Sequence, residues 1–275
     1  AWDSPWGMGR PGWHIECSTM SKKYLADTID IHAGGQDLTF PHHENEIAQS
    51  EAANGRPFAN YWMHNGYITI DSKKMSKSAG NFFTVRDILK EYDGEVIRFF
   101  LISGHYRSPI DFSRELMEQA KNGLARIRNA WQNLEFLKEK GSDGLTPEES
   151  ASLADILKYR EKFIAAMDDD LNTADAIAAV FELISEVNTQ VRTEASRQYA
   201  VGALDLLLEL TNVLGLLEKD DHADEDATLE ALIEERRIAR ENKDWAKADE
   251  IRDKLAAKGI TLKDTPQGVQ IIREN

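Results

Sequence analysis

The residue types that most directly suggest chemistry lie in one cationic run, Lys74-Met75-Ser76-Lys77-Ser78. Two lysines and two serines, followed by Gly80 and Asn81, form a polar loop that can neutralise charge on the phosphates of a nucleotide during a reaction. The alternative is an exposed lysine-rich turn, because most charged runs in proteins are simply solvated. The residue types alone leave both interpretations open.

The elements that would position this loop can be read on either side of it. Upstream, the alternating residues 64–70 predict a strand. Downstream, Thr84 with Asp87 three residues later predicts a capping box that opens a helix. The loop would then hang between a strand and a helix, which is where open α/β sheets bind ligands.

A second group of chemically capable residues lies earlier in the chain. His42 and Glu46 are four residues apart in a segment of helical composition, so they share one helix face. Cys17 is the single cysteine and cannot form an internal disulfide. Thiolate, imidazole and carboxylate are ligands that zinc accepts. An ordinary exposed His-Glu pair is the alternative, and His43 competes with His42 as the ligand.

A glycine turn follows a predicted buried strand that ends near His32. Gly34 and Gly35 would let the backbone approach a ligand closely, and Asp37 lies at the mouth of the turn. This short pattern is weak by itself and gains weight only from the neighbouring motifs.

The bulk composition limits the possible functions. With 275 residues the chain can form about two domains. It has no apolar run of the roughly 18 residues that a membrane span needs and no signal peptide, so we expect a cytoplasmic protein with no membrane partner. We also expect a monomer. The net charge of −15 argues at first against nucleic acid, but residues 143–227 hold 20 acids against 6 bases, so the acidity belongs to one segment.

Helical periodicity dominates the second half of the sequence. A stripe of apolar residues predicts a long helix from Arg114 to about Lys140. Further helices are predicted over residues 148–167, 174–193 and 196–214, followed by a helical hairpin over 228–258 and a β-hairpin around Thr265 to Gly268. The acidic triplet Asp168-Asp169-Asp170 is interpreted as negative charge at the start of the helix near Thr173, rather than as a metal site. The stripe of the long helix comprises Leu116, Ala120, Leu124, Ile127, Trp131, Leu134 and Leu137.

Several motifs together resemble bacterial cysteinyl-tRNA synthetase, a class I aminoacyl-tRNA synthetase. The lysine-rich run is identical to the second signature of that class. The segments at 12–17, 40–46, 61–64, 168–173 and 264–268 resemble the family in the same order and at similar spacing. The resemblance covers essentially the whole chain. The first signature, His-Ile-Gly-His, does not occur, so the chain is interpreted as the carboxy-terminal part of a longer enzyme or one of two pieces, and we expect it to be inactive alone.

The resemblance implies a fold and a domain plan. The fold class is α/β followed by all-α: the C-terminal half of a Rossmann-like catalytic domain, then an antiparallel helical bundle, then a small module of a helical hairpin plus a β-hairpin. The implied domains are a partial nucleotide-binding catalytic domain at 1–83, a connecting stem at 84–112, a bundle for anticodon binding at 113–217 and an anticodon-recognition module at 228–275.

The resemblance also implies an activity: ATP with Mg²⁺ would activate cysteine to cysteinyl-adenylate, and the acyl group would pass to the cysteine tRNA. One Zn²⁺ per chain would bind the substrate thiol, with a further cysteine ligand outside this sequence. The implied site residues are, for catalysis, Lys74 and Lys77; for ATP, Lys77, Gly34, Gly35, Gly66, Tyr67 and Ile68; for cysteine, Trp13 and Asp37; for the metal, Cys17, His42 and Glu46; and for the anticodon, Arg240, Trp245, Asp249 and Asp264.

Two other functions are weighed against this one. A tRNA-binding fragment without catalysis would bind the tRNA but form no adenylate. A ligase that joins cysteine to a small amine, as mycothiol-pathway relatives do, would have no use for the helical part after Ser113. For Trp245 the alternatives are a platform for base stacking and a cover over the junction of the hairpin.

Overall fold

The computed structural model describes residues 1–10, 12–70, 73–75, 83–191, 195–217, 232–240, 242–257, 260–265 and 268–273. The chain divides into two compact units. Unit 1 comprises residues 1–83 and 106–113, and unit 2 comprises residues 84–105 and 114–275. Among the described residues, no helix is both long and apolar enough to cross a membrane.

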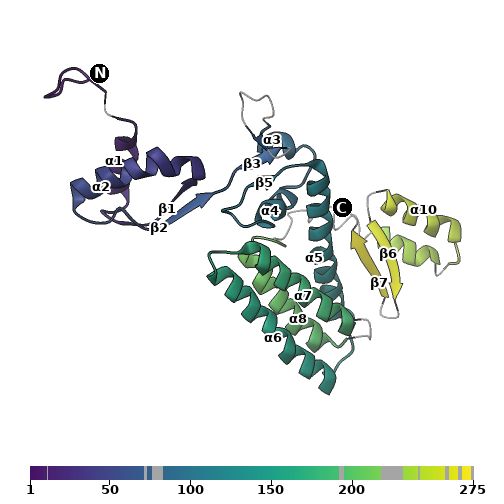
Figure 1. Cartoon of the computed structure of the whole chain (residues 1–275). Helices are drawn as coiled ribbons and strands as arrows, with labels where there is room; N and C mark the ends of the chain where they lie inside the picture. The colour runs from purple at the N-terminus through teal and green to yellow at the C-terminus, as the bar shows by residue number, and fades with distance from the viewer. Residues whose placement is uncertain are drawn as a thin grey trace. The chain divides into compact units, whose positions relative to one another are not determined.

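Unit 1 contains a β-α-β crossover, drawn in dark blue in Figure 1. Strand β1 (Ile29–Gly35) and strand β2 (Ala59–Asn65) pair in parallel, and helix α2 (Glu44–Asn54) connects them. Parallel strands require such a crossover because a short turn cannot reverse the chain twice. Helix α1 (His14–Tyr24) packs against α2, and two short helical segments, η1 (Gln36–Leu38) and η2 (Thr39–His43), lead from β1 into α2.

A second, three-stranded sheet in unit 1 has the order β4-β3-β5. Strand β3 (Ile68–Ile70) pairs antiparallel with β4 (Lys73–Lys74) and parallel with β5 (Ile110–Asp111). The prediction of one strand over residues 64–70 was therefore wrong, because the strand is interrupted at Gly66. The Gly66 N–H donates to the Tyr106 carbonyl oxygen instead of continuing a ladder, and a Cβ at this position would collide with the Ser108 backbone.

Unit 2 begins with two short helices, α3 (Val85–Ile88) and α4 (Gly94–Ile102). The predicted capping box is confirmed: the Thr84 hydroxyl accepts from the Asp87 N–H, and the Asp87 carboxylate accepts from the Thr84 N–H. The helix that this box opens is short and ends at Ile88. Asp93 has an extended backbone and its side chain caps α4, so the residues between the two helices must turn.

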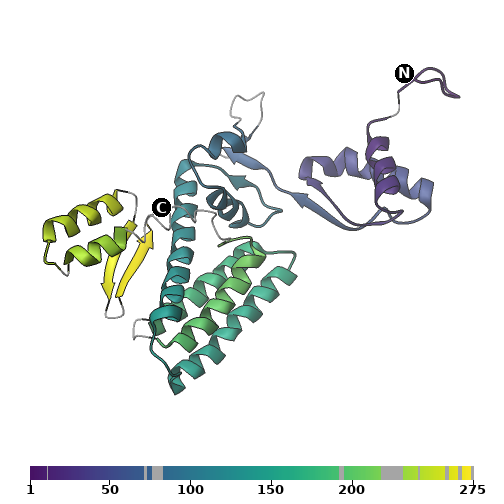
Figure 2. The same cartoon turned by 180° about the vertical axis from the view of Figure 1, so that it is seen from behind.

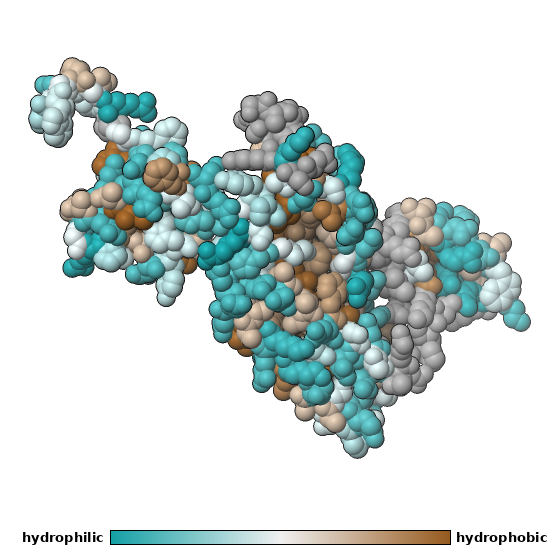
Figure 3. Space-filling model, in the orientation of Figure 1, coloured by the Kyte–Doolittle hydropathy of each residue, from teal (hydrophilic) through white to brown (hydrophobic). Residues whose placement is uncertain are grey.

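Four longer helices pack on one another to form most of unit 2, and both views of the chain show them side by side (Figures 1 and 2). They are α5 (Arg114–Lys140), α6 (Pro147–Asp168), α7 (Thr173–Val191) and α8 (Arg197–Val213). Their apolar stripes make the core, because burial of such stripes stabilises helix packing in water. Over α6 and the neighbouring end of α7 the surface seen in Figure 3 is mainly hydrophilic. The largest fully buried side chains here include Met117, Leu124, Ile127, Leu134, Ile156, Leu183, Tyr199, Leu204, Leu207 and Leu210.

The buried stripe of α5 differs from the predicted one at two positions. Met117 is fully buried while Leu116 is 37% exposed, and Ala130 is buried while Trp131 is half-buried. Helix α5 packs against several elements, including α4, α7 and α8, so the side chains that are buried depend on these neighbours as well as on the spacing of apolar residues.

The acidic triplet lies in the turn between α6 and α7. Asp168 is the last residue of α6, and Asp170 and Leu171 have positive φ values of 56° and 55°. The start of α7 is capped by Asn172, whose side-chain oxygen accepts from the Asp175 N–H. Asp170 lies 3.8 Å from the imidazole of His105. Asp169 and Asp170 lie in this turn, and the interpretation that the triplet supplies negative charge to the start of α7 stays a prediction.

The carboxy-terminal part of unit 2 consists of helical residues 232–240, helix α10 (Trp245–Ala256) and a two-stranded antiparallel sheet. Strand β6 (Ile260–Thr265) pairs with β7 (Gly268–Arg273), with Thr265 opposite Gly268. Ile251 and Leu255 of α10 form a small core with Leu232, Ile233, Ile260 and Leu262. Strand β7 contacts α5.

Candidate metal centre and nucleotide loop

The ends of β1 and β2 meet at the candidate site. Gly34 pairs with His64 and Gly35 with Asn65, at the carboxyl ends of these parallel strands. Ligands of open α/β sheets bind at such ends. A Cβ on Gly34 would lie 2.9 Å from the His43 ring, so only glycine allows the strand to pass this imidazole.

Three side chains converge behind these strand ends. Glu46, in the first turn of α2, is 5% exposed, and His43, at the end of η2, is 4% exposed. Together with His32 of β1 they offer ligand atoms that all lie within 4.8 Å of one another. Among the described residues, this is the group of three or more His, Cys, Asp or Glu that is gathered closely enough to hold a metal ion.

The Glu46 carboxylate has an oxygen with no hydrogen-bond donor. This oxygen, Oε2, is buried. It lies 2.9 Å from Nε2 of His32, but the geometry of this contact is not that of a hydrogen bond. Buried carboxylate oxygens are otherwise nearly always paired, because leaving one without a partner is costly. A bound cation would satisfy this oxygen, so the residues present fit a metal ion.

The imidazole of His43 has the protonation state that metal binding requires. Burial lowers the pKa of His43, and the nearby His32 lowers it further, while Glu46 opposes them. Neutral imidazole is the form that binds metals. Nδ1 of His43 lies 2.9 Å from Nε2 of His64, which fixes the ring, as an outer-shell partner does for a metal-bound histidine.

Cys17 lies on α1 and interacts with the Glu46 carboxylate. Burial raises the pKa of the Cys17 thiol, and the charge of Glu46 and a hydrogen bond to it raise the pKa further. Without a cation the thiol is therefore protonated at neutral pH. A metal ion between these two groups would reverse the effect, because it favours the thiolate.

His42 points elsewhere in this structure. Its Nδ1 atom lies 2.9 Å from Nε2 of His14, and its ring lies 5.7 Å from the ring of Trp13. The structure thus brings Cys17 beside Glu46 but does not gather His42 with them, and it gathers His43 instead. Consecutive residues of a helical segment point about 100° apart, so the two adjacent histidines cannot both face Glu46. The prediction of Cys17, His42 and Glu46 as metal ligands stays a prediction.

Sequence reasoning missed three histidines at this site: His14, His32 and His64. A signal was available, since five of the seven histidines lie within the first 64 residues. Their convergence depends on tertiary pairing of segments far apart in the chain.

The two residues predicted to line the cysteine pocket are Trp13 and Asp37. Asp37 is in η1, which follows Gly35, and Trp13 is 76% exposed.

The lysine-rich loop begins at β4. Lys74 pairs across the ladder with Thr69, and the Met75 N–H donates to the Ile68 carbonyl oxygen. Lys77 and the side chain of Lys74 lie outside the described residues. Of the backbone groups predicted to hold adenine, the Gly66 N–H donates to Tyr106 and the Tyr67 carbonyl oxygen accepts from Ile110. These groups are engaged in holding β3 beside the segment that contains β5.

The four residues predicted to read the anticodon lie in the carboxy-terminal part. Arg240 is at the end of the helical residues 232–240, and Trp245, the first residue of α10, is 58% exposed. Asp249 pairs with Arg252 at 2.9 Å. Asp264 is in β6 opposite Val269, and its side chain is outside the described residues. The exposure of Trp245 suits a stacking platform better than a cover over a core.

Comparison with known families assigns the class of protein first. Residues 1–122 match the family described as the class I (C) catalytic domain of tRNA synthetases, so unit 1 and the beginning of unit 2 belong to a class I aminoacyl-tRNA synthetase. Residues 162–218 match the DALR domain, and residues 222–273 match the anticodon-binding domain of cysteinyl-tRNA ligase.

Curated relatives identify the particular family. A protein of Symbiobacterium thermophilum named cysteine–tRNA ligase is 59% identical over 98% of this chain, and one of Lachnospira eligens with the same name is also 59% identical over 98% of this chain. The chain therefore belongs to the cysteinyl-tRNA ligase family. It spans 58% and 57% of the length of these two relatives.

Among solved structures, the chain resembles a synthetase of Agrobacterium radiobacter described as a LeuRS-tRNA-LeuAMS ternary complex. The TM-score is 0.54 at 20% identity, over 66% of this chain and 25% of that one. At this identity the likeness supports the class I fold alone.

Proposed function

We propose that this chain carries out its part of cysteine–tRNA ligation: activation of cysteine with ATP and transfer of the acyl group to the cysteine tRNA. The observation that carries the proposal is the buried Glu46 oxygen without a donor, next to Cys17 and a cluster of imidazoles, in a chain of this family. A site at the strand ends that can hold a metal suits recognition of a thiol substrate, because thiolates are favoured ligands of zinc.

The proposal assigns zinc to Glu46 and Cys17, with His42 as the third ligand by resemblance and His43 as the histidine that the structure brings closest. Zinc bound there would prefer the thiolate of cysteine over the hydroxyl of serine. The chain itself would position its ligands: His32 lies against Glu46, His64 against His43 and His14 against His42, each at 2.9 Å. Trp13 and Asp37 would bound the cysteine.

The nucleotide would bind beside the same strand ends. Gly34 and Gly35 leave room for the ribose, and the segment Gly66 to Ile68 would hold the adenine. Lys77, with Lys74, would neutralise the charge on the departing pyrophosphate, because positioning and charge stabilisation supply most of the catalysis in such reactions. The antiparallel bundle within 113–217 and the module at 228–275, with Arg240, Trp245, Asp249 and Asp264, would bind the anticodon side of the tRNA.

A chimera tests the activity. This chain replaces the matching stretch of the Symbiobacterium thermophilum ligase, and cysteine-dependent exchange of pyrophosphate into ATP is measured, followed by aminoacylation of the cysteine tRNA. We expect both activities. A Lys77→Ala variant should lower the exchange rate by at least about a hundredfold, while Lys90→Ala, at an exposed lysine outside the motif, should not. A chimera that folds and binds zinc but shows no exchange would contradict the proposal.

Metal analysis of the chain itself tests the substrate-reading site. We expect about one zinc per chain, bound more tightly when cysteine is present and not when serine is present. Cys17→Ser should weaken zinc binding and remove the preference for cysteine. A Cys17→Ser protein that keeps both would show that the thiol has no part in the site.

A further inference from the structure

The lysine-rich loop is attached to the rest of unit 1 at two points, one on each side of it. Before the loop, Lys74 pairs with Thr69 of β3 across the ladder. After the loop, the ring of Phe83 lies 4.4 Å from the ring of Phe112, at an angle of 49°. A loop whose two ends are held loses less conformational entropy when it becomes ordered around a ligand.

Both attachment points depend on one dipeptide, Asp111-Phe112. The Asp111 carboxylate accepts a hydrogen bond from the Thr69 hydroxyl at 2.7 Å, and the Phe112 N–H donates to the Thr69 carbonyl oxygen at 2.7 Å. Thr69 is thus held on β3 with Lys74 on one side and this dipeptide on the other. Because the ring of Phe112 also contacts Phe83, a change at the dipeptide affects both ends of the loop.

The residues just before this dipeptide hold the other parts of the proposed nucleotide site. The Tyr106 carbonyl oxygen accepts from the Gly66 N–H at 2.7 Å. The Arg107 carbonyl oxygen accepts from the side-chain amide of Gln36, which directly follows the glycine turn, also at 2.7 Å. The segment 106–112 therefore bonds to the end of the glycine turn, to the residues proposed to hold adenine, and to both ends of the lysine-rich loop.

We propose that Asp111 and Phe112 are positioning residues for the activation of cysteine with ATP. Their role is to hold the lysine-rich loop at a fixed place relative to the glycine turn, so that Lys77 reaches the phosphates. In reactions that depend on positioning, a misplacement of about 1 Å can cost about a hundredfold in rate. A segment that only completed the sheet would need its backbone ladder, but not the side-chain contacts with Thr69 and Phe83. The inference rests on the proposed function, which supplies the ATP and the role of Lys77.

Threonine-to-valine substitutions in unit 1 give a matched pair of variants. Thr69→Val removes the hydroxyl that donates to Asp111 and keeps a β-branched side chain on the strand. Thr28→Val removes a hydroxyl hydrogen bond of the same length, 2.7 Å, to the Pro57 carbonyl oxygen. Thr28 directly precedes β1, at the end of this strand opposite to the glycine turn, so it serves as the control.

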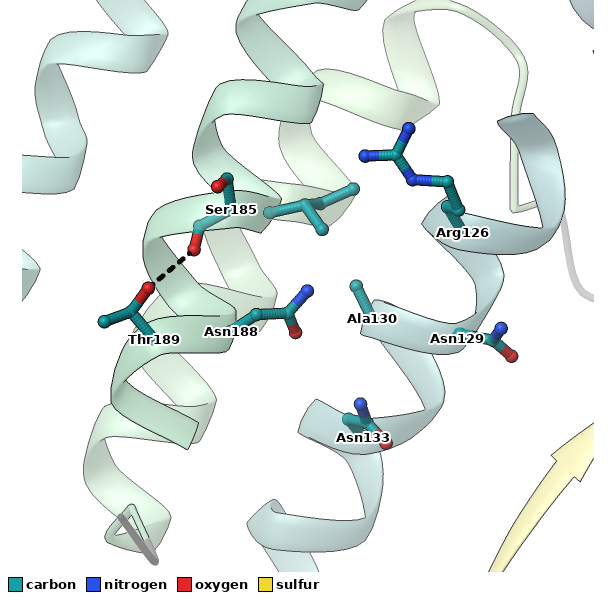
Figure 4. A pocket seen from close by; sticks show the side chains of 8 residues that line it. Arg126, Asn129, Ala130, Asn133, Ser185, Asn188 and Thr189 are labelled. Atoms are coloured by element: carbon teal, nitrogen blue, oxygen red, sulfur yellow. Dashed lines mark hydrogen bonds between the residues drawn. The ribbon is translucent and has the colours of Figure 1, made fainter. Parts of the chain in front are cut away.

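A second control lies in unit 2, in a groove between α5 and α7 (Figure 4). The buried residues Ala130 and Ile184 form its floor. On its polar rim, the Thr189 hydroxyl donates to the Ser185 carbonyl oxygen at 3.0 Å. Thr189→Val removes this bond in a part of the chain that the exchange reaction, which contains no tRNA, does not use.

The variants are made in the chimera with the Symbiobacterium thermophilum ligase, and cysteine-dependent pyrophosphate exchange is measured. Zinc content and thermal unfolding establish that each variant folds like the wild type. We expect Thr69→Val to lower the kcat of exchange at least about tenfold, with the KM for cysteine unchanged, and the two control variants to match the wild type. Phe112→Leu should give a similar loss. Asp111→Asn, which keeps an acceptor oxygen, should lose less activity than Asp111→Ala.

Combination with Lys77→Ala separates positioning from a merely structural role. Effects of residues that act as a unit are not additive, so a residue that acts through Lys77 has little further effect once Lys77 is removed. Thr69→Val should therefore change the exchange rate of the Lys77→Ala enzyme by less than about twofold. An equal loss in both backgrounds, or no loss in the wild-type background, would overturn this inference and leave the proposed function standing. Absence of exchange in the wild-type chimera would overturn the proposed function and this inference with it.

Discussion

Units 1 and 2 bury opposite kinds of side chain. Among the described residues of unit 1, the buried apolar side chains are those of Ile29 and Phe58, whereas Ser18, His43, Glu46 and Ser50 are buried and polar. In unit 2 the interior is a set of long helices with apolar stripes. The buried side chains of unit 1 are mostly of types that can bind a ligand, whereas those of unit 2 mostly pack helices against one another.

The difference has an energetic consequence. Buried apolar area is the main favourable term in folding, so unit 2 can be stable by itself. Unit 1 has buried groups that need partners, most clearly the Glu46 oxygen. A bound ion would supply one, so part of the stability of unit 1 is expected to come from its ligand.

The sharpest test of this comparison is to remove the metal. Zinc at about a thousand times its Kd should stabilise unit 1 by about 4 kcal/mol and leave unit 2 unchanged. Hydrogen exchange with mass spectrometry, with and without a chelator, would show protection lost in β1, α2 and β2 but not in α5 to α8. Glu46→Gln should abolish the effect, and Glu44→Gln, at an exposed position of the same helix, should retain it. Equal loss in both units would refute the comparison.

A core substitution should affect only unit 2. Leu124 is 1% exposed, so Leu124→Ala leaves a cavity and is expected to cost about 3 kcal/mol of the free energy of unfolding of unit 2. Leu157, on α6, is 45% exposed, and Leu157→Ala should cost less than about 0.5 kcal/mol. Urea unfolding followed by circular dichroism measures both. Zinc content should be the same in the two variants and the wild type, and a loss of zinc in Leu124→Ala would show that the units depend on each other.

One buried carboxylate in unit 2 is fully partnered, in contrast to Glu46. Glu149 accepts hydrogen bonds from the Thr146 N–H at 2.9 Å, the Ser196 N–H at 2.7 Å and the Ser196 hydroxyl at 2.8 Å. Glu149→Gln would turn an amide N–H toward a donor and should cost about 2 kcal/mol. Ser152 is buried nearby, and its hydroxyl makes a hydrogen bond with the Tyr199 hydroxyl rather than with Glu149. Ser152→Ala therefore serves as a milder control.

The pH dependence of the Glu149 variant gives a second readout. Burial alone would raise the pKa of Glu149, but the hydrogen bonds from Thr146 and Ser196 together lower it below 4.5. A carboxylate whose pKa is lower in the folded state adds stability above its unfolded pKa and loses it as the pH falls through the folded value. The difference between wild type and Glu149→Gln should therefore be constant from about pH 6 to 8 and shrink below about pH 4.5. A difference that grew toward acid pH would contradict this assignment.

The smallest expected effect concerns the cap of α3. Thr84→Ala removes the hydroxyl that accepts from the Asp87 N–H and should cost about 1 kcal/mol. The pKa of Asp87 is lowered to about 2 by hydrogen bonds from Lys90 and Thr84, so the variant should raise this pKa. Nuclear magnetic resonance titration of the Asp87 carboxyl would measure the change, and an unchanged pKa would show that Lys90 alone sets it.

Local signals in the sequence predicted most of the helices. The Thr84 and Asp87 box and the α5 stripe depend on residues three or four apart, which a sequence displays directly. The break in the strand at Gly66 could not be predicted in this way. It is caused by contacts with Tyr106 and Ser108, which lie some forty residues later in the chain.

The candidate site was predicted in part. Cys17 and Glu46 do lie together. The choice between His42 and His43 depends on the rotation of η2, an irregular segment where one residue of register decides which ring faces Glu46. The place of His32 depends on the pairing of β1 with β2. Neither the rotation nor the pairing leaves a local pattern in the sequence.

The pairing of β3 with β5 has a consequence for biosynthesis. Unit 1 takes its last strand, residues 110–111, from beyond the first two helices of unit 2, and Asp111 accepts from the Thr69 hydroxyl at 2.7 Å. On the ribosome, unit 1 therefore stays incomplete after residue 83 until thirty more residues have emerged, a delay of about 2 to 6 seconds at about 5 to 20 residues per second. Helices α3 and α4 leave the exit tunnel during that interval, so the helices of one unit begin to form before the sheet of the other can close.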